Sequence, residues 1–468
     1  MEGVHHRGSA TSGTSTATTP MRPGTPNSRS NPFADDISPA PGSANPFASP
    51  MNSRPASSFG GSSAMQRPTP RYFHSRRVRK GEVEKPWLAK KNPKEKWVTI
   101  IPLIGIALGL GVAGFLVWDG LRTVAHHKYC PVLMEDFSNG LDPSIWTKEV
   151  QCGGFGNGEF EVTTNTDENV YIQNGELVIQ PTLQDATLIE QQGVLNLTKD
   201  GTCTSSSLSD CVAVTNFTSG AIINPVKSGR INTKAGASIK YGRVEVVATL
   251  PKGDWLWPAI WMLPVNDTYG PWPQSGEIDI CESRGNNHTY PQGGNNIMSS
   301  ALHWGPNKAN DGFWRTNNKF SALHSTYSDK PHTFGLEWSQ KYLYTYVDSL
   351  LLQVMYTSFS TSLWERGEFP SSDSNGTRIT DIWASSGHNQ APFDQSFYLI
   401  MNVAVGGTNG WFQDAPGKPW VDSSPTAQRD FWNARDQWYP TWTSGNGAGK
   451  MTVKSVKMWR QCDGNESN

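Results

Sequence analysis

Residues 276–283 read GEIDICES, a short apolar run that carries three carboxylates, Glu277, Asp279 and Glu282, within six positions. Such a run predicts a β-strand, in which successive side chains point to opposite faces. Glu277 and Asp279 then share one face, while the two isoleucines point into a core. Strict alternation would place Glu282 on the apolar face. All three acids share a face only if a β-bulge adds one residue between Asp279 and Glu282, and bulges are frequent beside active sites.

The spacing of the two glutamates suits one type of chemistry. With one residue absorbed by the bulge, their backbones lie about four strand steps apart, roughly 13 Å. Side chains that lean together across a concave sheet would bring the carboxyl groups to about 5–5.5 Å, the separation expected of a retaining glycosidase. Glu277 would be the nucleophile and Glu282 the general acid and later the base, while Asp279 would hydrogen-bond Glu277 and make Glu282 hold its proton more tightly. The alternative is a half-buried strand whose acidic face is merely solvated.

The sequence around this run resembles the catalytic centre of a known family. Residues 251–286 read PKGDWLWPAIWMLPVNDTYGPWPQSGEIDICESRGN, so the E-I-D-x-x-E motif is accompanied by an upstream WPAIWML and a downstream ESRGN. This combination is similar to the family 16 glycoside hydrolases, in particular the laminarinase-type β-1,3-glucanases and their glucan-binding animal relatives. The resemblance continues through residues 156–164, 301–306, 332–352, 397–412 and 451–459.

The resemblance implies an all-β fold, a jelly-roll β-sandwich of two antiparallel sheets of the concanavalin A type, with a cleft on the concave sheet. The residues after 130 favour the same architecture, because they form many short alternating runs separated by Gly, Pro, Asn and Asp. The resemblance also implies Glu277 as nucleophile, Asp279 as its assistant and Glu282 as acid/base. These roles agree with those argued from spacing.

Aromatic residues indicate where a sugar would bind. The chain contains 19 Trp, of which 16 lie after residue 130, and indole rings commonly line sugar clefts because pyranose rings have apolar faces. The candidate substrate-binding residues are Trp257, Trp261, His303, Asn157, Glu159, Arg284, Asn402 and Trp411, and each has a structural role as its alternative. His303 is expected to hydrogen-bond Asp279 or Glu282, or else to be a packed core histidine. No cofactor is required, and Glu135 is a candidate ligand for the structural calcium that many relatives carry.

The first 96 residues differ in composition from the rest. Residues 1 to about 70 are rich in Ser, Thr, Pro and Gly and are predicted to be disordered, and residues 71–96 are basic. Residues 1–96 contain 15 Lys and Arg against 6 Asp and Glu, a net charge of +9, which leaves −10 for the remainder of a chain whose total is −1. The basic stretch directly precedes an apolar run, so it is predicted to lie on a membrane surface and not to bind nucleic acid.

Residues 97–118 form an uncharged, mainly apolar run with a tryptophan at each end. A helix of that length spans roughly 33 Å, enough for a bilayer core. The run is too long and too far from the N-terminus for a cleaved signal peptide, and the lysines before it place the N-terminus in the cytosol. We therefore predict a single-pass type II membrane protein of fungal-like design at the plasma membrane or in the secretory pathway. Its parts are a cytosolic tail (1–96), a transmembrane helix (97–118), a short stalk (119–129) and a luminal or extracellular hydrolase domain (130–468).

Glycosylation signals and cysteines support this orientation. The triplet N-x-S/T begins at Asn196, Asn216, Asn266, Asn287, Asn375 and Asn465, and none occurs before the apolar run. All six cysteines also follow that run, and an even number in an oxidising compartment suggests disulfides. Cys203 with Cys211 would close a short loop, and Cys130 with Cys462 would join the two ends of the domain, although sequence alone leaves the connectivity open.

Two short motifs in the predicted cytosolic tail suggest a partner. Asn31 to Phe33 and Asn45 to Phe47 both read Asn-Pro-Phe, which resembles fungal endocytic sorting signals. They would bind endocytic adaptors and imply cycling between the plasma membrane and internal compartments.

The sequence thus predicts a membrane-anchored retaining endo-β-glucanase that acts on β-1,3-glucan by double displacement. If the acceptor is a sugar hydroxyl and not water, the same site would be a transglycosylase, or a glucan-assembly protein of cell-wall biogenesis. The third alternative is a non-catalytic β-glucan-binding receptor. That alternative has no evident need for three acids that repel one another.

Overall fold

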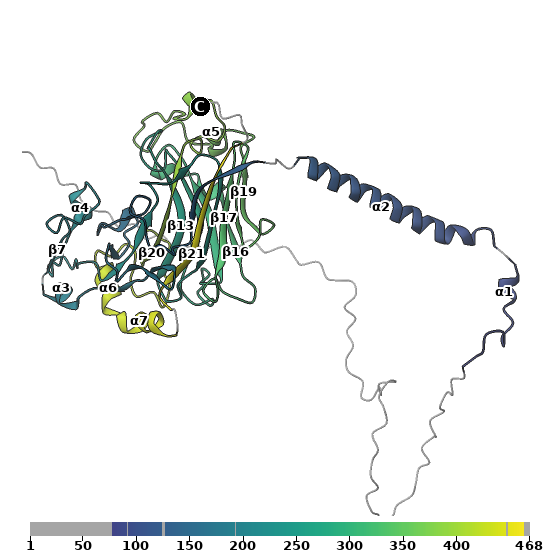
Figure 1. Ribbon diagram of the computed structural model, residues 1–468, viewed down its shortest axis with the longest axis horizontal. Coiled ribbons are helices and arrows are strands. Elements are labelled where there is room, and N and C mark those ends of the chain that lie inside the picture. Colours follow the sequence, from purple (N-terminus) through teal and green to yellow (C-terminus); the bar gives the residue numbers. More distant parts are fainter. Residues whose placement is uncertain (1–76, 91, 124–126, 192, 446–447, 463–468) are drawn as a thin grey trace, which may run out of the picture. The chain divides into compact units, whose positions relative to one another are not determined.

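The computed structural model describes residues 77–90, 92–123, 127–191, 193–445 and 448–462 (Figure 1). These residues form a short helical part and a β-rich domain, each of which is described by itself. The two Asn-Pro-Phe motifs and the glycosylation signal at Asn465 lie outside the described residues.

The helical part contains α1 (Pro86–Ala89) and α2 (Glu95–Thr123). Within α2, the 27-residue candidate span Glu95–Leu121 contains an 18-residue window with a mean hydropathy of 2.5. They rise about 40 Å along the helix axis, so α2 is long and apolar enough to cross a membrane. The helix starts two residues before the predicted span of 97–118 and continues five residues into the predicted stalk.

Sheet A has eight strands in antiparallel pairs, in the order β19-β18-β17-β12-β21-β5-β4, with β1 also paired to β21. Its strands are β1 (Tyr129–Glu135), β4 (Val170–Gln173), β5 (Glu176–Ile179), β12 (Gly242–Thr249), β17 (His332–Trp338), β18 (Tyr342–Val347), β19 (Gln353–Ser358) and β21 (Met451–Gln461). The long C-terminal strand β21 lies beside both β1 and β12, so the first and last strands of the domain are neighbours.

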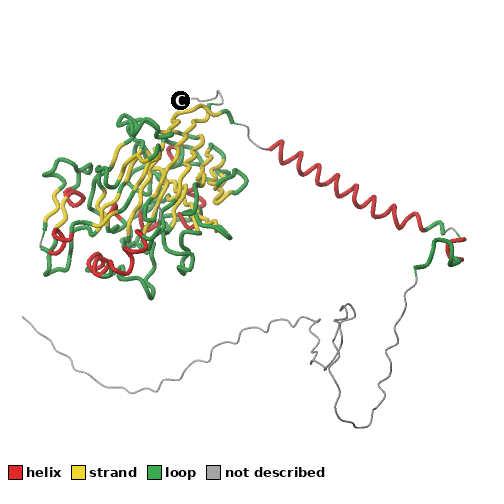
Figure 2. Tube along the Cα trace, turned by 60° about the horizontal axis from the view of Figure 1, so that its bottom comes forward, coloured by secondary structure: helices red, strands yellow, loops and turns green. Residues whose placement is uncertain are grey.

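Sheet B also has eight strands in antiparallel pairs, in the order β16-β15-β14-β13-β20-β10-β2, with β11 paired to β20. Its strands are β2 (Thr147–Lys148), β10 (Arg230–Asn232), β11 (Ser238–Ile239), β13 (Leu256–Pro264), β14 (Glu277–Ser283), β15 (Ile297–His303), β16 (Asn317–Ser321) and β20 (Phe397–Val405). The predicted all-β fold of two antiparallel sheets is confirmed, and the strands of both sheets gather in one body (Figure 2).

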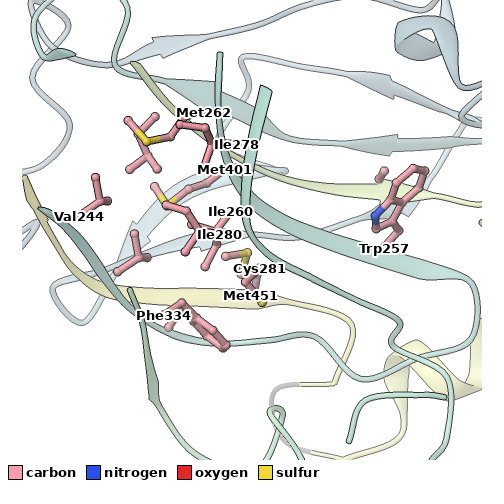
Figure 3. Packing of buried hydrophobic residues seen from close by; sticks show 14 of the residues in the cluster. Val244, Trp257, Ile260, Met262, Ile278, Ile280, Cys281, Phe334, Met401 and Met451 are labelled. Carbon is pink, nitrogen blue, oxygen red and sulfur yellow. The ribbon is translucent and has the colours of Figure 1, made fainter. Parts of the chain in front are cut away.

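The core lies between the two sheets. Sheet B contributes Ile260, Met262, Ile278 and Met401, and sheet A contributes Val244, Phe334 and Met451, all of them fully buried. Figure 3 shows side chains from both sheets meeting in this cluster. Because alternate residues of a strand point to opposite faces, burying one face of sheet B leaves its other face free to form a site.

Smaller elements decorate the sandwich. One small sheet contains β3 (Glu161–Thr163), β9 (Val226–Ser228) and β6 (Thr182–Leu183), and a second pairs β7 (Val194–Asn196) with β8 (Val212–Val214). The helices are α3 (Ala186–Glu190), α4 (Leu208–Cys211), α5 (Leu363–Gly367), α6 (Ala427–Asn433) and α7 (Arg435–Thr443), and the 3₁₀ turns are Gly154–Gly156, Lys308–Asn310, Phe313–Arg315 and Ala384–Ser386. Trp432, Trp438 and Trp442 of α6 and α7 are buried, so part of the tryptophan excess belongs to the core and not to a cleft.

Both predicted disulfides are present. Cys130 pairs with Cys462 and Cys203 with Cys211. The first joins the ends of the domain across 332 positions of sequence, beside the paired strands β1 and β21. Cys152 and Cys281 are free and buried.

Candidate functional site

The predicted bulge is present in β14. Asp279 pairs with Ala301 of β15, and Glu282 pairs with Ser299. Two residues of β14 therefore face one residue of β15, which is the definition of a bulge. The extra residue returns Glu282 to the face that already carries Glu277 and Asp279, while Cys281 stays in the core.

Two tryptophans hold the two glutamates. The indole Nε1 of Trp272 donates a hydrogen bond to Oε2 of Glu277 at 2.9 Å, and Nε1 of Trp257 donates one to Oε1 of Glu282 at 3.0 Å. Each carboxyl group thus has a fixed neighbour, although the two donors come from different parts of the chain. Figure 3 shows Trp257 at some distance from the other labelled members of the buried cluster, with its indole nitrogen visible.

The environment of the acids favours bound protons. Burial, followed by the negative charge of Asp279, raises the pKa of Glu277 well above its ordinary value. The same two causes raise the pKa of Glu282 to about 8. The charge of His303 and the hydrogen bond from Trp257 act in the opposite direction on Glu282. A carboxylic acid that keeps its proton near neutral pH can act as a general acid.

His303 lies directly opposite Glu277 in the sheet register. Its Nε2 is 3.3 Å from Oδ2 of Asp279, and its Nδ1 is hydrogen-bonded to Oδ2 of Asp311. Burial alone would lower the pKa of His303, but the contacts with Asp279 and Asp311 and the charge of Glu277 raise it well above its ordinary value. His303 therefore lies beside Asp279, and its carboxylate neighbours favour the protonated form of the ring.

The same side chains form a compact group of possible ligand atoms. Ligand atoms of Glu277, Asp279 and His303 lie within 4.8 Å of one another, the one such group found in the part of the chain that the structure describes. The protonated form of His303, which its carboxylate neighbours favour, has no lone pair for a metal. Glu135 is the candidate calcium ligand. Its Oε1 accepts a hydrogen bond from the backbone N–H of Phe137, and its Oε2 accepts one from Nε1 of Trp146. Calcium binding at Glu135 stays a prediction.

Three predicted sugar-binding residues pack on one another. The rings of Trp257 and Trp411 are stacked, with centroids 4.7 Å apart. The guanidinium of Arg284 lies 4.0 Å from the Trp411 ring centroid, and its Nε and Nη2 donate to the Trp411 carbonyl. Trp257 occupies one face of Trp411, so Arg284 must cover the other. This stack supports Trp257, whose indole in turn donates a hydrogen bond to Glu282. Sugar contacts of these three residues stay a prediction.

The other candidates lie on the same open face of sheet B or at its edge. Trp261 is opposite Asp279 in the register, and its Nε1 donates to Oδ1 of Asn402 at 2.8 Å. Asn157 donates to Oε1 of Glu159, whose side chain is buried and whose Oε2 has no hydrogen-bond partner among the described residues. The backbone N–H of Thr408, just after β20, donates to the Asn157 carbonyl, which places this segment at the end of β20.

The sequence argument missed residues that lie around Glu277 and His303. Trp272 and Phe313 are 40% and 43% exposed, unusual values for large aromatic rings. The Phe313 ring stacks on His303 at a centroid distance of 5.2 Å. Trp272 stands only five residues before Glu277, and this proximity in sequence could have indicated a role at the site. Asp311 and Phe313 belong to a loop whose sequence carries no recognisable signal.

The exposure of the asparagines in the N-x-S/T triplets bears on the predicted glycosylation. Asn216, Asn266, Asn287 and Asn375 are exposed, and Asn196 is half-buried. These asparagines are therefore accessible or partly accessible for modification, which stays a prediction.

Comparison with known proteins agrees with this architecture. The profile of "Glycosyl hydrolases family 16" matches residues 160–396. The chain is 41% identical over 341 residues to a "Beta-1,3-glucan-binding protein" of Penaeus monodon, and this alignment covers 70% of this chain and 90% of the relative. It is 32% identical over 288 residues to a "Glucan endo-1,3-beta-glucosidase" of Cryptopygus antarcticus, covering 60% of this chain and 83% of the relative. The laminarinase of Rhodothermus marinus aligns with 72% of this chain over its full length, at 25% identity and a TM-score of 0.45. The chain belongs to the glycosyl hydrolases of family 16.

Proposed function

We propose that the protein is a retaining endo-β-glucanase that acts on β-1,3-glucan by double displacement. In the first step Glu277 attacks the anomeric carbon while Glu282 protonates the departing glycosidic oxygen, which leaves a covalent glycosyl-enzyme. In the second step Glu282 removes a proton from the incoming water, which releases the sugar and restores both carboxyl groups. Asp279 and His303 balance the charge around the nucleophile.

One observation supports this proposal most strongly. The bulge in β14 brings three acids to a single open face, and each glutamate has its own tryptophan donor. Keeping acidic groups together against their mutual repulsion costs free energy, and a site that only binds a neutral polysaccharide gains nothing evident from that cost. The name of the Cryptopygus relative agrees with the enzyme proposal.

A binding protein without activity is the second candidate, because the Penaeus relative is named for glucan binding. A transglycosylase would use the same residues with a sugar hydroxyl as acceptor. To separate these functions, the detergent-solubilised chain would be incubated with β-1,3-linked and mixed-linkage glucan oligomers, and the masses of the products would be measured by mass spectrometry. Shorter oligomers are expected. Products longer than the starting oligomer would make the protein a transglycosylase, and binding without any product would contradict the enzyme proposal.

The anchoring is a further part of the proposal. Helix α2 would serve as a signal anchor with the N-terminus in the cytosol, so that the hydrolase domain carries its glycans and disulfides outside. The Asn-Pro-Phe motifs would bind endocytic adaptors, and Glu135 would be a ligand of a structural calcium ion. Protease protection of sealed membrane vesicles tests the orientation: the tail should be digested and the domain protected. A protected tail would contradict it.

The pH dependence of the reaction follows from the general acid. Because Glu282 must carry a proton when the glycosidic bond breaks, kcat/KM is expected to fall as the pH rises through about 8, the pKa of this residue. An unperturbed glutamate, with a pKa of about 4.3, would have lost its proton below neutral pH. Activity that declines already near pH 6 would contradict the assignment of Glu282.

Trp257→Phe tests the same residue. The indole N–H stabilises the charged carboxylate, so its loss should raise the pKa of Glu282 and move the alkaline limb to higher pH. The lost hydrogen bond to a charged group, worth about 1.5 kcal/mol, should lower kcat/KM about tenfold. Trp432→Phe, at a buried tryptophan of α6, is the control and should leave the profile in place. An unshifted alkaline limb in Trp257→Phe would refute the role of its indole.

A further inference from the structure

Among the described residues, neighbouring side chains contact both nitrogens of His303 and pack against its ring. Its two nitrogens face Asp311 and Asp279. The Phe313 ring stacks on it with an interplanar angle of 18°, and the Trp272 ring lies against it with centroids 5.6 Å apart. A histidine held in this way has one orientation, in which each ring nitrogen faces a carboxylate.

Asp311 is itself firmly placed. Its Oδ1 accepts hydrogen bonds from the backbone N–H groups of Trp304 and Phe313, both at 3.1 Å. Oδ2 is thereby left to His303. The backbone N–H of Gly312 donates to the Trp304 carbonyl at 2.7 Å, which closes the turn that carries Asp311. The side chain of Asp311 is only 10% exposed, so water competes weakly with His303 for its charge.

We propose that Asp311 is a positioning residue that orients His303 and keeps it positively charged against Asp279. The positive charge on His303 would offset the negative charge of Asp279 and would itself favour the ionised form of the nucleophile Glu277. The charged groups that face His303 are Glu277 and Asp279 on β14 and Asp311 on the loop after β15. The kinetic consequence rests on the proposed function, whereas the effect on His303 does not.

A purely structural role of Asp311 would produce a different result. If Asp311 only closed the turn, asparagine would serve nearly as well, because its side-chain oxygen can still accept from the two backbone N–H groups. Asparagine has no negative charge, however, and cannot stabilise an imidazolium to the same extent. Asp311→Asn therefore separates the two roles.

The experiment measures the protonation of His303 directly. The full chain in detergent micelles would carry ¹³C-labelled histidine, and the ring signals would be followed against pH by NMR, with His303→Gln identifying the signal. In Asp311→Asn the pKa of His303 is expected to fall by about one unit or more, equivalent to a tenfold change in its proton affinity. His388, which pairs with Asp394 elsewhere in the domain, is the internal control and should titrate as in the unaltered chain.

A second variant keeps the test decisive if the asparagine form misfolds. Asp311→Glu retains the charge but alters the reach of the carboxylate, so His303 should stay nearly as basic as in the unaltered chain. An unchanged His303 titration in Asp311→Asn, or a fall in Asp311→Glu as large as that expected of Asp311→Asn, would overturn the proposal. If the unaltered chain cleaves no glucan yet His303 responds as expected, the proposed function fails and this inference stands. In an active enzyme, Asp311→Asn should lower kcat and leave KM nearly unchanged.

Discussion

Glu277→Gln is expected to lower kcat on β-1,3-glucan by about 10⁴-fold or more, the order of loss seen when a covalent catalyst loses its nucleophile. Glutamine has the shape of glutamate, and its amide oxygen can still accept from Nε1 of Trp272. It cannot, however, form a glycosyl-enzyme. Initial rates of oligomer cleavage measure the effect, and glucan binding should be retained because the shape of the side chain is unchanged.

A matched control guards against a general effect of removing one charge. Glu365 is an exposed acid on α5, so Glu365→Gln should leave the rate unchanged. Rescue provides a second check. In Glu277→Ala a small anion such as azide can enter from the vacated side and should yield an α-glycosyl azide. A Glu277→Gln variant with a tenth or more of the original rate would show that Glu277 is not the nucleophile.

Removal of the Cys130–Cys462 disulfide is expected to have the largest effect on stability. The bridge closes a loop of 332 positions, and constraint of so long a loop in the unfolded chain is worth about 6 kcal/mol in the chain-entropy account. The bridge between Cys203 and Cys211 spans only 8 positions, for which the same account gives about 2–3 kcal/mol.

The two double serine variants should therefore be compared with each other. Urea unfolding followed by tryptophan fluorescence gives the free energy of unfolding of each variant. The Cys130/Cys462 variant should lose about twice as much as the Cys203/Cys211 variant. Equal losses, or a larger loss from the short loop, would contradict the view that the long bridge stabilises the domain by restricting its unfolded chain.

The sequence predicted the parts of the site that depend on neighbouring residues. Alternation of side chains along 276–283 predicted a bulge before Glu282 on the condition that the three acids share one face, and the register with β15 confirms the bulge. The positions of Cys130 and Cys462 at the two ends of the domain suggested their pairing, although the sequence left the connectivity open, and the structure contains this disulfide. Both inferences use local geometry or chain order, which a sequence states directly.

The contacts that sequence could not predict join distant segments. Arg284 and Trp411 lie 127 positions apart, yet the arginine donates two hydrogen bonds to that tryptophan's carbonyl. Stacking of Trp257 on Trp411 likewise depends on how the loop after β20 folds back on β13. Asp311 was missed because a single acid in a polar loop has no pattern, and only the turn that it closes brings it to His303.

The central claim is that Glu277 and Glu282 cleave β-glucan with retention of configuration. The anomeric form of the first product tests it directly, because ¹H NMR separates α and β hemiacetal signals before they equilibrate. We predict that the β form appears first when the protein cleaves a β-1,3-glucan oligomer and that the α form grows only by later mutarotation. An initial α product would contradict double displacement, and the absence of any product would contradict the claim that this site is catalytic.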